Sequence, residues 1–257
     1  MHTRLLAFVF LPLFLVAGRA GAQVVPPETA NVELGAMFWT PTPEITLTSD
    51  SFGGSVDFVK EFNIEDTRFR EFRAVLKVGR KHKIRFSRVA VKYDESTTLA
   101  NTISFEGRTF PAGTPADTNI EWNLMRIGYE WDFVARDYGF VGLVTELKYN
   151  KVTGTISNAL GSATTGEQKV PVPTVGGIAR GYLGKYVSFT GEFTGFSLDR
   201  EEFRGKFYDF DVYAQLNLVK SLAGQVGYRS VSVDYLVDGD AGVLKLKGPY
   251  FGGVLRF

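Results

Sequence analysis

The side chains that could do chemistry in this sequence are mainly charged residues spaced two apart. The sequence has no cysteine, which excludes disulfides and thiolate metal sites. It has two histidines, His2 and His82, the residue type most often used as a general base. His82 lies in the polar stretch 79–83 and is interpreted as a solvated turn residue. We therefore expect no catalytic residue, no metal site and no cofactor.

Acidic and basic residues alternate with apolar ones along several segments. In 206–219, Asp209 and Asp211 occupy odd positions, while Tyr208 and Phe210 begin an apolar series at even positions. A spacing of two places side chains on one face of a strand. Opposite charges on that face can pair, which predicts a network formed by Glu71, Arg73, Lys77, Arg126, Glu130, Glu146, Lys148, Arg180, Asp209, Asp211 and Arg229.

Ten alternating segments must position these side chains, and their period near two indicates an all-β protein. They span 31–40, 68–79, 82–94, 119–133, 139–152, 172–184, 186–198, 206–219, 222–236 and 243–257. Short connections at 80–81, 134–138, 185 and 221 alternate with longer ones, which is typical of an up-and-down transmembrane barrel. The longer connections are 41–67, 95–118, 153–171, 199–205 and 237–242, and 56–62 could form one helical turn.

The alternation changes phase within several segments. In 82–94, Ile84 and Phe86 share one parity, whereas Val89 and Val91 share the other. Similar breaks occur near Leu124, Ser230 and Gly248-Pro249. A β-bulge would produce such a break, because one extra residue turns every later side chain to the other face. Misplaced strand ends would produce it as well.

Residues 1–22 have the features of a secretory signal peptide. Arg4 gives a positive start, 5–17 is an apolar run, and 20–22 is a small-x-small cleavage site. The run is shorter than the ~20 apolar residues that a spanning helix needs. The expected mature domain is 23–257. Without Arg4 and Arg19 it carries 29 − 2 = 27 basic and 28 acidic residues, which gives no electrostatic case for nucleic acid.

The sequence ends in an alternating strand with a final aromatic residue. Tyr250, Gly252, Leu255 and Phe257 match, Tyr250 loosely, the pattern polar-x-Gly-x-x-hydrophobic-x-aromatic. With the export signal, this resembles the bacterial outer-membrane β-barrel proteins. The resemblance implies an assembly signal read by the barrel-assembly machinery, periplasmic chaperones as partners during biogenesis, and a place in the cell outer membrane. We expect one closed antiparallel up-and-down transmembrane β-barrel of about ten strands, with eight or twelve as alternatives.

The apolar face could point to lipid or, in a soluble lipocalin-like barrel, to an internal core. Aromatic residues near the strand ends favour lipid, because such residues form girdles at bilayer interfaces. We expect this girdle to contain Phe38, Trp39, Tyr129, Trp131, Phe133, Tyr138, Phe140, Tyr186, Tyr208, Tyr228, Tyr235 and Phe257.

The lumen is expected to be largely filled. With Arg85, Glu121, Asp132, Glu192 and Arg256 added, the charged face holds eight acids and eight bases. Balanced charges favour an ion-paired plug, and ten strands lie near the size at which side chains fill a barrel.

A non-enzymatic structural or surface-interaction barrel is therefore the predicted function, with lipid and lipopolysaccharide as outer-membrane partners. A narrow pore for small solutes is the alternative. A hydrolase with an unfamiliar catalytic set is the third hypothesis. Small barrel enzymes such as the omptin proteases use a histidine at the outer rim, and His82 is predicted at the opposite, periplasmic end.

Overall fold

A computed structural model of the 257-residue chain describes residues 30–49, 54–105, 107–158, 163–199, 203–237 and 240–257. The predicted signal peptide lies outside these residues.

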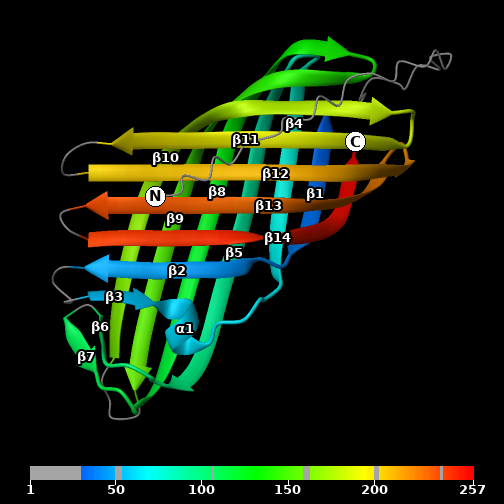
Figure 1. Cartoon of the computed structure of the whole chain (residues 1–257). Coiled ribbons are helices and arrows are strands. Elements are labelled where there is room, and N and C mark those ends of the chain that lie inside the picture. The colour runs from blue at the N-terminus through cyan, green and yellow to red at the C-terminus, as the bar shows by residue number, and fades with distance from the viewer. Residues whose placement is uncertain (1–29, 50–53, 106, 159–162, 200–202, 238–239) are drawn as a thin grey trace, which may run out of the picture.

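Ten antiparallel strands form a closed ring (Figure 1). Each strand pairs with the next one in the ring, and β1 closes it against β14 through pairs from Glu33↔Arg256 to Trp39↔Tyr250. The prediction of a closed antiparallel barrel of about ten strands is confirmed. The ring consists of β1 (Val32–Trp39), β4 (Phe69–Gly79), β5 (His82–Thr98), β8 (Pro115–Arg136), β9 (Gly139–Asn158), β10 (Ala163–Leu183), β11 (Val187–Asp199), β12 (Phe203–Val219), β13 (Leu222–Val237) and β14 (Asp240–Arg256).

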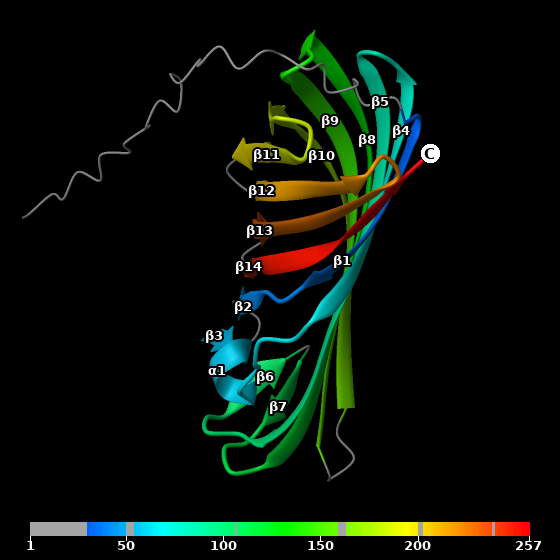
Figure 2. The same cartoon turned by 90° about the vertical axis from the view of Figure 1, so that its right-hand side faces the viewer.

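The end opposite the tight turns is more structured than predicted. The expected loop 41–67 contains β2 (Thr42–Ser49), β3 (Gly54–Asp57) and α1 (Phe58–Phe62), which is the anticipated helical turn. The expected loop 95–118 contains the hairpin of β6 (Ile103–Phe105) and β7 (Arg108–Phe110). β2 pairs with the first half of β14, and α1 and the hairpin gather at the same end of the molecule (Figure 2).

The expected long loops 153–171, 199–205 and 237–242 are largely strand, so that part of the prediction is wrong. Their polar, glycine-rich sequences pair in register, for example from Val152↔Gln168 to Ser157↔Ala163. The strands therefore continue well beyond the apolar segments from which they were recognised.

The bulges expected in mid-strand are also absent from the described pairings. In β8, Trp122, Leu124 and Arg126 all point inward, and the register with β5 is continuous through them. Register shifts occur instead near the tight turns, between Lys77/Gly79, Trp131/Val134 and Asn217/Val219. Along each strand the same alternate side chains point inward throughout. What changes is the polarity of the residues on the inner and outer sides of the wall.

The outer surface of the barrel carries an apolar belt. On β12 its outward residues run from Tyr208 to Leu218, eleven residues along a tilted strand. At ~3.4 Å per residue and a tilt of ~40°, the belt is ~26 Å tall, which matches the apolar band of a membrane barrel. No helix among the described residues is long and apolar enough to span a membrane.

Aromatic side chains lie at both borders of the belt. Phe38, Tyr208 and Tyr228 are exposed at one border, and Trp131 and Tyr138 at the other. Three residues expected in this girdle are not part of it. Trp39 and Phe140 point inward and are buried, and Tyr235 has the inward parity of Val231, beyond the belt.

The interior has two layers. Charged side chains fill the part of the lumen that the apolar belt surrounds. Beyond the belt, toward α1 and the β6–β7 hairpin, the inward side chains become apolar and form the main hydrophobic core, which includes Trp39, Trp122, Phe207, Leu246 and Ile156. The outward side chains become polar at the same level, for example Arg88 on β5 and Asn123 on β8.

Candidate functional site

The charged lumen is the most elaborate side-chain assembly in the described chain. All eleven residues of the predicted network point into it, from six strands of the ring. Glu121, expected on the same face, points outward and pairs with Lys92, because the side chains keep their parity through Leu124. Two lumen residues, Lys83 and Glu33, were not anticipated.

Arg229 of β13 lies at the centre of the network and is fully buried. Its Nε and Nη2 donate to the two carboxylate oxygens of Asp209 at 3.0 and 2.9 Å, and its Nη1 donates to Glu71 at 2.8 Å. The guanidinium also lies over the ring of Trp39, at 5.5 Å from its centroid. Arg229 therefore links two carboxylates that are far apart in the sequence and joins the charged layer to the apolar one.

Asp209 and Glu71 each meet three cations. Asp209 accepts from Lys148 at 2.7 Å and from Arg126 at 3.3 Å, in addition to Arg229. Glu71 accepts from Arg73 at 2.9 Å and from Arg126 at 3.4 Å. Buried carboxylates in a water-poor interior need such pairing, because an unpaired buried charge is strongly destabilising.

The remaining members extend the network around the wall. Arg73 pairs with Asp211 at 2.9 Å, and Asp211 accepts the Tyr250 hydroxyl at 2.8 Å. Lys148 also contacts Glu146 at 3.2 Å. Arg180 donates to Thr190 and Tyr213, both at 2.9 Å.

Two further groups lie closer to the tight turns. Lys83 bridges Glu130 at 2.6 Å and Asp132 at 2.9 Å, with its ammonium 3.5 Å from the centre of the Phe140 ring. Lys77 pairs with Glu33 at 2.9 Å.

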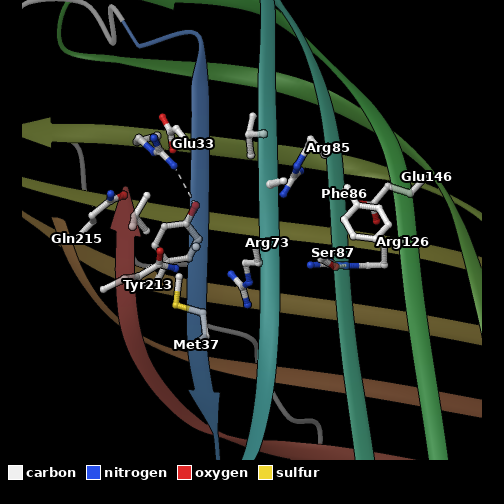
Figure 3. A pocket seen from close by; sticks show the side chains of 16 residues that line it. Glu33, Met37, Arg73, Arg85, Phe86, Ser87, Arg126, Glu146, Tyr213 and Gln215 are labelled. Atoms are coloured by element: carbon white, nitrogen blue, oxygen red, sulfur yellow. Dashed lines mark hydrogen bonds between the residues drawn. The ribbon is translucent and has the colours of Figure 1, made fainter. Parts of the chain in front are cut away.

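A cavity of about 60 Å³ remains in the middle of the lumen (Figure 3). Arg73, Arg85 and Arg126 border it on one side, and Glu33, Tyr213 and Gln215 on the other. One water needs ~10–15 Å³ by this measure, so the space suits a few waters and is much smaller than a ligand site of ~300 Å³ or more.

The apolar layer closes the lumen on the side of α1. Phe58 and Phe62 of α1 are buried and stack at 5.7 Å between ring centroids, and Phe58 meets Phe105 of the hairpin edge-on. Phe110 and Trp122 are also fully buried in this cluster. A solute crossing the barrel would have to displace both this packed core and the ion network.

The four residues of the predicted assembly signal divide between the two faces of β14. Tyr250 is buried in the lumen, where its hydroxyl serves as the polar group. Gly252 faces β1 so closely that an added Cβ would lie 2.2 Å from the Ala36 carbonyl oxygen. Leu255 and Phe257 are exposed on the apolar belt. These positions explain the residue types structurally and leave recognition by an assembly factor as a prediction.

His82 begins β5 beside a tight turn, at the end of the barrel opposite α1. Its Nδ1 lies 2.5 Å from the Tyr129 hydroxyl, and the two rings stack. His82 is the one histidine among the described residues, and within them no three His, Asp or Glu side chains are grouped to hold a metal.

No family model and no curated protein matches the chain. Among solved structures, it is similar to the outer membrane protease OmpT of Escherichia coli, at a TM-score of 0.62 and 11% identity over 88% of this chain and 97% of that one. Ail of Yersinia pestis aligns at a TM-score of 0.40 with 10% identity over 88% and 99% of the two chains. The Pseudomonas putida toluene transporter TodX aligns at 0.39 with 6% identity over 92% and 93%. The similarity to OmpT shows that the chain has the fold of the bacterial outer-membrane β-barrels.

Proposed function

We propose that this chain, which has the fold of the bacterial outer-membrane β-barrels, is an integral outer-membrane protein without enzymatic activity. Its lumen is closed, and its role is structural or one of surface interaction. The observation that carries this proposal is the filled lumen, in which an ion-paired layer and an apolar layer lie one above the other.

The belt supports membrane placement. Exposed apolar side chains on the outer wall would be unfavourable in water and are stable in contact with acyl chains. The tight turns then face the periplasm, and α1 with the β6–β7 hairpin faces the outside, as in other barrels with short periplasmic turns.

The charge at the outer border of the belt supports contact with an outer leaflet that carries phosphate groups, as lipopolysaccharide does. On six strands the first polar residue that points outward beyond the belt is basic, and on the described strands none of these positions is acidic. The six residues are Arg70, Arg88, Lys151, Lys169, Lys206 and Lys247.

The site chemistry favours a non-enzymatic role. OmpT is a protease, but its identity to this chain is 11%, so the likeness extends to the fold alone. Here His82 lies at the periplasmic end, away from the surface on which an external substrate would arrive. The two central lumen carboxylates, Asp209 and Glu71, are each held by three cations, which leaves them poor bases.

Planar-bilayer recording of the purified, refolded protein tests the closed lumen. We expect silence or brief low-conductance events, because no continuous aqueous path is compatible with both layers. A large, steady, ion-selective conductance would contradict the proposal and favour the narrow-pore alternative. Membrane placement is tested separately by fractionation and by heat-modifiable migration on a gel, and recovery as a soluble periplasmic monomer would contradict it.

A further inference from the structure

The barrel wall is split between β10 and β11 on the outer side. β10 pairs with β9 along its length, from Ala163↔Ser157 to Gly181↔Gly139. Its pairing with β11 extends only from Leu183↔Val187 to Val175↔Gly195. Beyond Val175 the two strands separate, and Figure 1 shows β10 continuing away from the direction of β11.

Two prolines explain why the pairing stops there. The Tyr182 amide donates to Tyr138 on the β9 side, and amide direction alternates along a strand, so the backbone nitrogens of odd-numbered residues face β11. Pro171 and Pro173 are odd-numbered and have no N–H to donate. Continued in register, they would oppose Asp199 and Ser197 of β11 and leave the ladder without two of its donors.

An open groove of about 910 Å³ lies beside this split, on the lipid-facing wall. Ile127, Leu147, Pro173 and Val175 line one side and are apolar and exposed, while the half-buried Phe196 of β11 lines the other. At its base the groove reaches the buried Glu146, which pairs with Lys148 in the lumen. The lining also includes Thr174, which is buried, and whose Oγ1 has no hydrogen-bond partner among the described residues. The groove thus combines an apolar outer wall with a buried polar base formed by Thr174 and Glu146.

A basic pair lies directly above the groove. Lys151 of β9 and Lys169 of β10 are register partners on the outward face. Both contact the Glu167 carboxylate, Lys151 at 2.8 Å, which leaves the three side chains with one excess positive charge. The two lysines lie four residues from Leu147 and Pro173, which is ~13 Å along the strands. Because the strands are tilted by ~40°, this corresponds to ~10 Å along the barrel axis.

We propose that the split between β10 and β11 is a binding site for a phosphate-bearing lipid of the outer leaflet, whose acyl chain occupies the groove while its phosphate contacts Lys151 and Lys169. This inference rests on the proposed membrane placement. The depth between the basic pair and the groove is that between a lipid headgroup and its chain.

The prolines also argue against a peptide strand as the occupant. A strand added to the free edge of β10 would need main-chain donors along that edge. Pro171 and Pro173 remove two of them, which is how natural proteins protect sheet edges from pairing. An acyl chain needs no such donors, and the groove is continuous with the apolar belt.

The chain contains a matched control for the basic pair. Elsewhere on the border, Lys245 and Lys247 lie two residues apart on β14 and both contact Glu44 of β2, and neither lines the groove. Retention of diphosphoryl lipid A by the purified, refolded protein in detergent should be measured for the wild type, for K151Q/K169Q and for K245Q/K247Q. Heat-modifiable migration verifies that each variant is folded.

We expect K151Q/K169Q to bind diphosphoryl lipid A about thirtyfold more weakly, the loss associated with two membrane-surface lysines. The K245Q/K247Q variant should stay within about twofold of the wild type by the same scale. Lipid A without phosphates should bind the wild type as weakly as K151Q/K169Q binds the phosphorylated form, and inorganic phosphate should not displace the lipid. Val175→Trp, which fills the groove and keeps both lysines, should also weaken binding.

Equal losses in the two lysine variants would reduce the effect to general charge and overturn the site. Unchanged binding in Val175→Trp would overturn the role of the groove, and displacement by inorganic phosphate would identify a free-anion site instead. A protein that inserts into membranes and retains no lipid A contradicts only this inference. A protein that remains soluble contradicts the proposed function.

Discussion

Replacement of Arg229 by methionine tests whether the lumen is a dry, paired network or a hydrated space. Methionine approximates the length of the arginine side chain and its apolar stem, and it removes the guanidinium. Asp209 would lose both of its hydrogen bonds to Arg229, and Glu71 would lose the one at 2.8 Å. Each carboxylate would keep two cations, Arg126 in both cases, with Lys148 at Asp209 and Arg73 at Glu71.

The expected loss of stability follows from how deeply these three side chains are buried. Arg229 has no exposed side-chain surface, and Asp209 and Glu71 have almost none. Breaking a buried pair by removing one partner typically destabilises a protein by ~3–5 kcal/mol, because the remaining charge stays uncompensated. The cations that remain reduce this loss, so we expect ~2–4 kcal/mol. In a lumen that water enters, the same change would cost ~1 kcal/mol or less, as for exposed pairs.

Reversible urea unfolding in lipid vesicles, followed by tryptophan fluorescence, measures the difference. Trp39 lies against Arg229 and reports directly on the site. Arg88→Met is the matched control, because Arg88 is exposed on the outer wall and donates to Asn123 across the strand pair. It should change the free energy of unfolding by ~0.5 kcal/mol or less. Equal effects of the two substitutions would refute the paired, water-poor lumen.

Three other predictions address the plug, the closure of the ring and the outer border. Combining Arg229→Met with Trp122→Ala should raise conductance in planar bilayers, whereas either change alone should leave the barrel closed by the other layer. Gly252→Ala should lower the assembled fraction on gels far more than Gly253→Ala, because the added methyl would lie 2.2 Å from a backbone oxygen in the first case and 3.9 Å in the second. Hydrogen bonds from Lys151 and Lys169 lower the pKa of Glu167, beyond the membrane-spanning part of β10, to about 2. The stabilisation that these contacts give should therefore be complete above the usual pKa of 4.5 and be lost as the pH falls through 2. A titration followed by carboxyl chemical shifts should place the midpoint of Glu167 near 2 in the wild type and closer to 4.5 in K151Q/K169Q.

The period-two pattern was sufficient to predict the ten strands and their order. In 206–219, for example, charged and apolar residues alternate without exception from Tyr208 to Asp211, and β12 is found there. The inward position of the eleven network residues could be predicted from the same alternation. Each of them has apolar residues beside it in the sequence, and because those residues face the outer belt, the charged residue faces the lumen. Their partners could not be predicted, because Arg229 and Glu71 meet across the lumen and no sequence period encodes that distance.

The failures arise where the strands leave the belt. In β5 the outward residues Ile84 and Phe86 are followed by Arg88, while the inward residues change from Arg85 to Val89. In the sequence, this change looks as if the apolar residues had moved to the other face of the strand. In the structure the register is continuous, and the apolar residues face outward in the belt and inward beyond it. The missed ends of β9, β10 and β14 have the same cause.

This reversal has a physical consequence for how the two halves are held together. In the proposed membrane placement, lipid surrounds the wall within the belt, so burial of apolar surface supplies little internal driving force. Backbone pairing and buried ion pairs then hold the lumen together. Beyond the belt, water surrounds the wall, and the strands enclose a hydrophobic core as in a soluble barrel, with Trp122, Phe207 and Phe110 at its centre. Trp39 and Arg229 are in contact where these two regions meet. The same strands thus support a polar interior in lipid and an apolar interior in water, and the closed lumen that we propose depends on both.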